Sequence, residues 1–161
     1  MVSRRDAILG AGLLLGAAGP ALGQSVKAPP VTPRHARFAA EIAAAQGRLD
    51  AFMVAFNARD LTAYEASFNF PHVRFASSTV TIINPGYHKP EMFERGSLAD
   101  WHHSAWDRRD VIHASADKVH IDTRFTRYRQ DGTVLAGFDS IYIVTRLDGR
   151  WGIQGRSSFA P

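Results

Sequence analysis

Three of the seven histidines fall within residues 101–113, "WHHSAWDRRDVIH". Histidine binds metal ions and transfers protons near neutral pH, so this stretch is the first candidate for chemistry. His102 and His103 are adjacent, and neighbouring side chains on a helix or strand diverge too far to share one metal ion. His113 and His120 would face each other across a hairpin, but two ligands fall short of a metal site. The sequence therefore predicts no metal ion, and it indicates no organic cofactor.

We interpret residues 101–107 as the rim of a pocket. Trp106 would supply an apolar wall, and His103 or His102 a polar edge. His72 is a further candidate for ligand contact, although strict alternation along a strand points Phe75 inward and His72 outward. A β-bulge or the preceding proline would reset that count.

Two Asp-Gly pairs, in "QDGT" and "LDGR", predict two-residue turns between the last three strands. Counting outward from these turns places Arg124 opposite Asp139, and Asp139 opposite Ser158. The neighbouring row on the same face holds Asp122, Ile141 and Arg156. The opposite face is apolar and carries three rows: Phe125, Phe138 and Phe159; Ile121 and Tyr142; Val119, Val144 and Ile153.

The mixed face of this sheet has two interpretations. If it lines an enclosed pocket, the cation of Arg124 would keep the Asp139 carboxylate ionised. Asp139 would then be a base, and Asp122 or Arg156 would bind a polar substrate oxygen. If the face is solvated instead, the same residues form ordinary cross-strand ion pairs.

The segments before this sheet are predicted to form helices. Thr32 and Pro33 form an N-cap with proline at the first helical position, and an apolar stripe follows at steps of four and three until about Ala58. The stripe consists of Phe38, Ile42, Ala45, Leu49, Phe52 and Phe56. Asp60 is placed to cap a second, short helix. From Pro71 onward the apolar period drops to two, which predicts strands to the end of the chain.

The chain has 161 residues, no cysteine and a net charge of +4. Disulfides, thiol nucleophiles and cysteine-ligated metals are therefore excluded, and the scattered basic residues argue against a nucleic-acid partner. Residues 1–23 combine an arginine pair with a short apolar run and the ending "ALG", which is typical of an export signal of the twin-arginine type, with a Sec signal as the alternative. We expect a spacer over 24–36 and one domain over 37–161, periplasmic or secreted and with no stable membrane anchor after processing.

Two longer stretches carry a resemblance. "AFMVAFNARDLTAYEASFNFPHVRF" and "RYRQDGTVLAGFDSIYIVTRLDGRWGI" are similar to the NTF2-like superfamily, specifically its SnoaL-like and ketosteroid-isomerase-like domains. The likeness covers roughly residues 38–160. It implies an α+β fold in which amino-terminal helices pack on a strongly curved antiparallel sheet and enclose an apolar pocket, often in a homodimer.

Functional positions of that family match only in part. Asp139 falls where the ketosteroid isomerases have the aspartic acid of their oxyanion hole. Phe52 stands at the position of their oxyanion-hole tyrosine, and Phe75 at that of their proton-shuttling aspartate. Because two of these three groups are missing, ketosteroid isomerisation is not supported.

Two functions follow from the resemblance. The first is an enzyme of isomerase, dehydratase, lyase or hydrolase type that performs cofactor-independent acid–base chemistry on a small apolar or aromatic molecule. The second is a non-catalytic ligand-binding or dimerisation protein of the same fold. The candidate catalytic residues are Asp139, Arg124 and Asp122, and the candidate ligand contacts are Phe52, Phe56, His72, His103, Trp106, Arg156 and Ser158.

Overall fold

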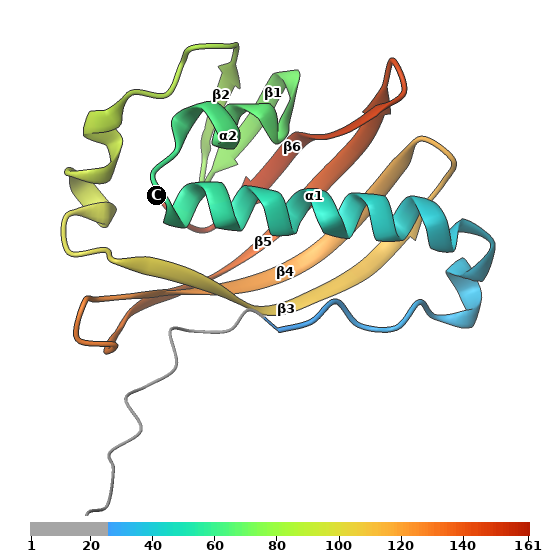
Figure 1. The fold of residues 1–161 in the computed structure, drawn as a ribbon, viewed down its shortest axis with the longest axis horizontal. Coiled ribbons are helices and arrows are strands. Elements are labelled where there is room, and N and C mark those ends of the chain that lie inside the picture. Colours follow the sequence, from blue (N-terminus) through green and yellow to red (C-terminus); the bar gives the residue numbers. More distant parts are fainter. Residues whose placement is uncertain (1–25) are drawn as a thin grey trace, which may run out of the picture.

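The computed structural model describes residues 26–161 (Figure 1). A 3₁₀ turn, η1 (Pro33–Phe38), leads into the long helix α1 (Ala39–Asn57), which is followed by the short helix α2 (Leu61–Ala66). Two further 3₁₀ turns, η2 (Pro90–Phe93) and η3 (Gly96–Leu98), lie between the second and third strands. The strands are β1 (Phe68–Ala76), β2 (Thr79–Ile83), β3 (His103–Ala114), β4 (Lys118–Tyr128), β5 (Val134–Leu147) and β6 (Arg150–Ser158).

All six strands form one sheet in the order β2-β1-β6-β5-β4-β3. Neighbouring strands are antiparallel except β1 and β6, which run parallel. The sequence predicted antiparallel pairing throughout, and the parallel pair arises because the first hairpin adds to the sheet beside the last strand. The predicted α+β architecture is confirmed.

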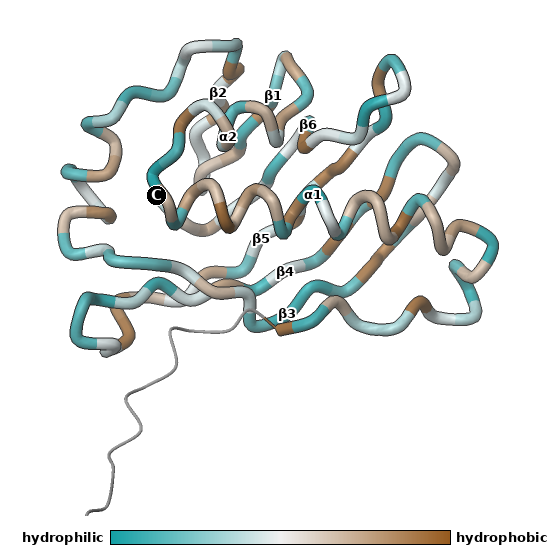
Figure 2. The backbone as a smooth tube through the Cα atoms, viewed as in Figure 1, coloured by the Kyte–Doolittle hydropathy of each residue, from teal (hydrophilic) through white to brown (hydrophobic). Residues whose placement is uncertain are grey.

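Helix α1 crosses one face of the sheet (Figure 1), and the core lies between the two. Leu49, Phe52 and Met53 from the helix are buried against Ile121 and Tyr142 from the sheet. Figure 2 shows hydrophobic and hydrophilic residues alternating along the strands that the helix crosses, as expected when one face of a sheet is covered. The apolar face of the last three strands is therefore the helix-facing one.

Local contacts fix where the helices end. The Asp60 carboxylate accepts a hydrogen bond of 3.0 Å from the backbone N–H of Ala63, so the predicted N-cap of α2 is confirmed. At the end of α1, the Asn57 side chain donates to the carbonyl of Ser104 (2.9 Å) and accepts from the Ser104 N–H (2.8 Å). Asn57 thereby ties the helix to β3. No helix within residues 26–161 is long and apolar enough to cross a membrane.

The predicted register holds for one hairpin and fails for half of the next. Arg124 pairs with Asp139, as the turn in "QDGT" predicts. Leu147 pairs with Arg150 around the second Asp-Gly turn, but the register slips between Ile143 and Val144 because β6 carries an extra residue there.

This β-bulge changes which side chains of β6 face the helix. Beyond it, Arg156 pairs with Tyr142 and Ser158 with Ser140, one residue away from the predicted partners. Because the side-chain period of a strand is two, a slip of one residue turns Arg156 and Ser158 from the outer face to the inner face. The bulge is therefore the feature that brings Arg156 inside the molecule.

Candidate functional site

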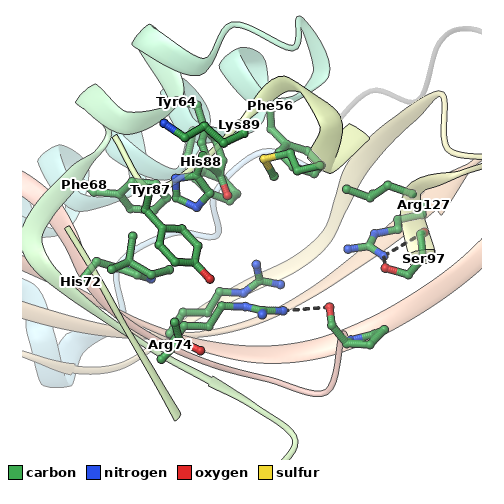
Figure 3. A pocket seen from close by; sticks show the side chains of 17 residues that line it. Phe56, Tyr64, Phe68, His72, Arg74, Tyr87, His88, Lys89, Ser97 and Arg127 are labelled. Atoms are coloured by element: carbon green, nitrogen blue, oxygen red, sulfur yellow. Dashed lines mark hydrogen bonds between the residues drawn. The ribbon is translucent and has the colours of Figure 1, made fainter. Parts of the chain in front are cut away.

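A cavity of about 380 Å³ lies on the inner side of the sheet (Figure 3). It is enclosed by the end of α1, the helix α2, the strands β1, β2, β4 and β6, the segment over residues 87–98 and Pro161. Its wall consists of Phe52, Phe56, Tyr64, Phe68, His72, Arg74, Thr81, Ile83, Tyr87, His88, Lys89, Met92, Ser97, Leu98, Arg127, Arg156 and Pro161. The volume is typical of a site for a small organic molecule.

Stacked aromatic rings form the apolar part of the wall. Phe52 lies 6.1 Å from Phe56, 5.1 Å from Tyr64 and 5.9 Å from Phe68, measured between ring centroids. Tyr64 meets Phe68 edge to face at 4.9 Å. Packing of this kind holds the rings in fixed orientations, so the cavity presents a rigid aromatic surface.

Three arginines from three different strands line the same cavity. Arg74 on β1 donates hydrogen bonds to the main-chain oxygens of Ala160 (3.1 Å) and Pro161 (2.9 Å). Arg127 on β4 donates to the carbonyl and the hydroxyl of Ser97, at 3.2 and 2.8 Å. Arg156 on β6 donates to the hydroxyl of Ser158 at 3.0 Å. Figure 3 shows the guanidinium groups of Arg74 and Arg127 reaching into the hollow from different sides.

The positive charges of this arginine cluster (Arg74, Arg127 and Arg156) act on one another. Burial, with the charges of Arg156 and Arg74 acting in the same direction, lowers the pKa of Arg127 to about 10. Burial and the charge of Arg156 likewise lower the pKa of Arg74. Within residues 26–161, the lining residues include no aspartate and no glutamate. The side chains that line the cavity therefore carry an excess of positive charge, and two of the arginines are partly withdrawn from water.

His72 lies in the wall beside this cluster and is 2% exposed. Its Nδ1 is 3.0 Å from the carbonyl oxygen of Ile153, and a carbonyl can only accept, so Nδ1 carries the proton. Burial lowers the pKa of His72 to about 4, with the charges of Arg156 and Arg74 acting in the same direction. His72 is therefore a neutral imidazole at pH 7, and its Nε2 is a hydrogen-bond acceptor.

His88 forms a second polar feature of the wall together with Glu65. The Glu65 Oε1 atom lies 3.2 Å from Nδ1 of His88 and accepts from the His88 backbone N–H at 3.2 Å. The other oxygen accepts from the backbone N–H of Gly86 at 2.7 Å. Burial alone would raise the pKa of Glu65, but these hydrogen bonds outweigh it and the net shift is downward. Glu65 is therefore an ionised carboxylate that contacts His88 but does not itself line the cavity.

The predicted catalytic pair lies elsewhere. Arg124 does contact Asp139 at 3.0 Å, but their side chains are 47% and 50% exposed on the outer face of the sheet. Asp122 contacts Arg108 on the same face. The expectation that Arg124, Asp139 and Asp122 face an enclosed hollow is wrong, because the helix covers the opposite, apolar face. These residues form solvated cross-strand ion pairs.

The predicted ligand contacts divide into two groups. Phe52, Phe56, His72 and Arg156 line the cavity, whereas Ser158 lies behind Arg156 as its hydrogen-bond partner. Strict alternation would have pointed His72 outward, but the register of β1 shifts between Phe68 and Val73, and His72 lies inward, as the sequence allowed for a reset count. Phe75 is accordingly 46% exposed on the outer face.

The two rim residues lie away from the cavity. Trp106 is 1% exposed and packs in the core against Phe52 and Tyr142, at 6.3 and 5.6 Å between ring centroids. His103 stacks on Tyr128 at 4.9 Å. The interpretation of these two as pocket rim is wrong, because strand β3 begins at His103 and carries its inward side chains into the core.

The expected pairing of His113 with His120 is confirmed, with ring centroids 6.0 Å apart. Within the part of the chain that the structure describes, no three histidine, aspartate or glutamate side chains come together as a metal site would require.

Several residues of the site escaped the sequence analysis: Arg74, Arg127 and His88 line the cavity, and Glu65 contacts His88. Arg74 follows His72 by two residues, so the two share a face of β1, and Arg127 follows Phe125 by two on the apolar face of β4. A basic residue that interrupts an apolar alternation was thus the signal for both arginines. The contact between Glu65 and His88 joins the end of α2 to the segment that follows β2, with the β1–β2 hairpin between them. The sequence carries no signal for this contact.

Comparison with known proteins fits this architecture. Residues 41–158 match the family described as NTF2-like protein (DUF6841). The chain belongs to this NTF2-like family. No curated protein matches the chain.

Solved structures show the same fold at low sequence identity. The NTF2-like chain resembles a ketosteroid isomerase-like protein from Erwinia carotovora atroseptica (19% identity, TM-score 0.55, covering 75% of this chain and 98% of that one). It also resembles an NTF2-like protein of unknown function from Shewanella oneidensis (16% identity, TM-score 0.57, covering 73% and 98%). A third is an NTF2-like protein with a cystatin-like fold from Novosphingobium aromaticivorans (10% identity, TM-score 0.60, covering 78% and 84%). These likenesses establish the fold alone.

Proposed function

We propose that this NTF2-like protein binds a small amphiphilic molecule in its cavity. The anionic group of the ligand contacts Arg74, Arg127 and Arg156, and its apolar or aromatic body packs against Phe52 and the rings around it. The observation that carries the proposal is the convergence of three arginines on one aromatic cavity with no acidic lining residue in the described chain.

Charge and solvation support an anionic ligand. Burying a cation costs several kcal/mol unless a counter-charge is close. Within residues 26–161 no acidic side chain lines the cavity, and Arg74 is instead hydrogen-bonded to main-chain oxygens of Ala160 and Pro161. Guanidinium groups donate bidentate hydrogen bonds to carboxylate or phosphate oxygens, which makes them suited to such a group. The Nε atoms of Arg127 and Arg156 are also buried without a hydrogen-bond partner within residues 26–161. An anion in the cavity would neutralise the arginine cluster.

This proposal revises the expected ligand. The sequence favoured a small apolar or aromatic molecule, whereas the arginine cluster favours a molecule that also carries negative charge. Ligand binding was the alternative function in the sequence analysis. An enzymatic function stays a second candidate because His88, hydrogen-bonded to Glu65, lies in the same wall.

Export and dimerisation stay predictions. The export signal over residues 1–23 lies outside the described residues. The outer face of the sheet exposes the apolar side chains Phe75, Ile141 and Leu147, which supports a homodimer through that face. Light scattering of the purified protein measures this directly, and a monomer at tens of micromolar would contradict it.

Matched pairs of probes test the binding proposal. Isothermal titration with 2-naphthoate and with 2-naphthalenemethanol compares an anionic and a neutral head on the same ring system. We expect the carboxylate to bind at least about tenfold more tightly, because hydrogen bonds to charged groups contribute about 1.5–3 kcal/mol. Decanoate and decanol repeat the comparison for an aliphatic body.

Substituting one arginine of the cluster tests whether the cluster is what distinguishes the acid from the alcohol. Arg156→Met should reduce the affinity for 2-naphthoate about tenfold or more and leave the affinity for 2-naphthalenemethanol nearly unchanged. Arg124→Met is the matched variant on the outer face, and it should leave both affinities unchanged. Equal binding of the acid and the alcohol, or equal effects of the two variants, would contradict the proposal.

A further inference from the structure

His88 differs from the other residues of the cavity wall in having a carboxylate bound to one of its ring nitrogens. Its side chain is 9% exposed, and that of Glu65 is 19% exposed. The ring stacks on Phe68 at 5.7 Å and meets the edges of Tyr64 and Tyr87 at 5.0 and 5.3 Å. Figure 3 shows His88 among these rings, across the cavity from Arg127. The imidazole is therefore held in one orientation from several sides.

The contact with Glu65 determines which ring nitrogen carries the proton. An ionised carboxylate only accepts hydrogen bonds, so the Nδ1 of His88 must be the donor. In the neutral ring the other nitrogen, Nε2, then has a lone pair. A carboxylate that fixes the tautomer of a histidine and stabilises its protonated form is the arrangement by which enzymes prepare a general base.

Burial and the charge of Arg74 favour the neutral form of His88, which is the form that can accept a proton. Burial lowers the pKa of His88, and although Glu65 acts in the opposite direction, the net shift is downward. The ring is therefore neutral at pH 7 and able to accept a proton. The titratable and charged groups that face it are Glu65 and Tyr64 from α2, His72 and Arg74 from β1, and Tyr87 and Lys89 beside it in the chain.

We propose that His88 is the general base of an enzymatic reaction in this cavity, with Glu65 as its positioning residue and the arginine cluster as the stabiliser of the developing oxyanion. The proposal rests on the proposed binding function, because the same arginines hold the substrate. The substrate class is an amphiphilic molecule with an acidic C–H bond next to an oxygen-bearing group. Nε2 takes the proton, the C–H electron pair moves into the substrate, and the resulting negative charge comes to rest on the oxygen beside the arginines.

The proton has two subsequent fates. The His88 imidazolium returns it to a different carbon, which is an isomerisation, or to a departing group, which is an elimination. Both reactions balance without an oxidant, reductant or further reagent. The chemistry thus agrees with the isomerase or lyase type expected from the sequence, but it uses different residues from the predicted Asp139, Arg124 and Asp122.

The elimination of 5-nitrobenzisoxazole is a suitable probe because it needs only a base and an oxyanion stabiliser. The base removes the ring C–H proton, its electron pair forms the nitrile, and the N–O bond breaks to leave a coloured phenolate. We expect the wild-type protein to accelerate this reaction above the rate in buffer that contains an equal concentration of imidazole. Inhibition by 2-naphthoate places the reaction in the cavity. The absence of acceleration would overturn the proposal.

Two variants assign the roles. His88→Asn keeps a side-chain N–H for Glu65 but removes Nε2, and it should reduce the rate about 10²-fold, within the range for loss of a general base. Glu65→Gln should reduce the rate less and shift its rise with pH to lower pH, because the carboxylate raises the pKa of His88. A purely structural role of Glu65 would leave the pH profile in place. His103→Asn, outside the cavity, is the matched control and should keep the wild-type rate.

Binding measurements separate this proposal from the previous one. His88→Asn and Glu65→Gln should bind 2-naphthoate within a few-fold of wild type and melt cooperatively. Binding without wild-type elimination would refute catalysis by His88 and leave the binding function intact. If the wild-type protein does not bind 2-naphthoate, the binding function is refuted. Should His88→Asn fail to fold, the pH profile of Glu65→Gln decides the question.

Discussion

Replacing His72 by asparagine should flatten the dependence of stability on pH below neutrality. In the folded protein the pKa of His72 is lowered to about 4 from its ordinary value of 6.5 by burial, with the nearby arginine charges acting in the same direction. The unfolded chain therefore binds a proton at His72 more readily than the folded protein does. The free energy of unfolding is unaffected above pH 6.5 and falls as the pH decreases toward 4.

The size of the effect follows from the two pKa values. The contribution of His72 lowers the free energy of unfolding by about 2 kcal/mol at pH 5 and about 3 kcal/mol at pH 4, relative to pH 7. His72→Asn retains a side-chain N–H for the carbonyl of Ile153 but has no group that titrates. Its loss of stability between pH 7 and pH 4 should be smaller than that of wild type by this amount.

Urea unfolding at pH 7, 6, 5 and 4, followed by circular dichroism, measures the difference. Only the slope against pH is compared, so a constant offset from the lost imidazole ring does not matter. Other titrating groups contribute equally to both proteins. Parallel slopes would show that His72 titrates normally, and the account of a buried His72 in the wall of a positively charged cavity would then be wrong.

Two further substitutions test other parts of the structure. Asp139→Asn should change the free energy of unfolding by less than about 1 kcal/mol and leave the affinity for 2-naphthoate unchanged, because the pair with Arg124 is half exposed on the outer face; calorimetry that shows a large loss of affinity would contradict this placement. Gly152→Ala should destabilise the protein by about 1–3 kcal/mol, because the new Cβ would collide with the side chain and the backbone nitrogen of Asn69. Gly47→Ala, which meets nothing within 4 Å, is its control in thermal unfolding and should be neutral or stabilising.

The fold was predictable because local signals agreed with one another. The apolar stripe of the first helix, the cap at Asp60 and the two Asp-Gly turns each specify a neighbouring element without reference to distant residues. Pairing of Arg124 with Asp139 followed from counting outward from a turn, and the structure confirms it. Such features depend on contacts within one hairpin or one helical turn, so residue types and their spacing are enough to predict them.

The site was less predictable because it depends on irregularities. A single extra residue in β6 turns Arg156 inward. The glycines of "GIQGR" are a residue type found at bulges, but glycine alone does not show where the register shifts. The more important error concerned the faces of the sheet. The sequence separated an apolar and a mixed face correctly for β4 and β5, but beyond the bulge in β6 Arg156 and Ser158 lie inside and Phe159 is exposed, the reverse of the prediction. Resemblance favoured the mixed face for the pocket, because Asp139 matches a family position. In the structure the apolar face lies against α1, because burying apolar surface stabilises the fold, and the cavity is on that side of the sheet.

The cavity also combines segments that are far apart in the chain. Arg74, Arg127 and Arg156 come from three strands, and only the order of strands in the sheet brings β6 beside β1. Glu65 at the end of α2 meets His88 in the irregular segment after β2, on the other side of the β1–β2 hairpin along the chain. Long-range juxtapositions of this kind follow from topology, so the sequence indicated the elements but not the cluster.

A crystal structure with 2-naphthoate bound tests the central claim most directly. We expect the naphthalene ring against Phe52 and Phe68, with both carboxylate oxygens within hydrogen-bond distance of guanidinium nitrogens of Arg74, Arg127 or Arg156. Density for the ligand in the outer groove beside Phe75, or in the cavity with its carboxylate turned away from all three arginines, would contradict the claim that this is an anion-binding site.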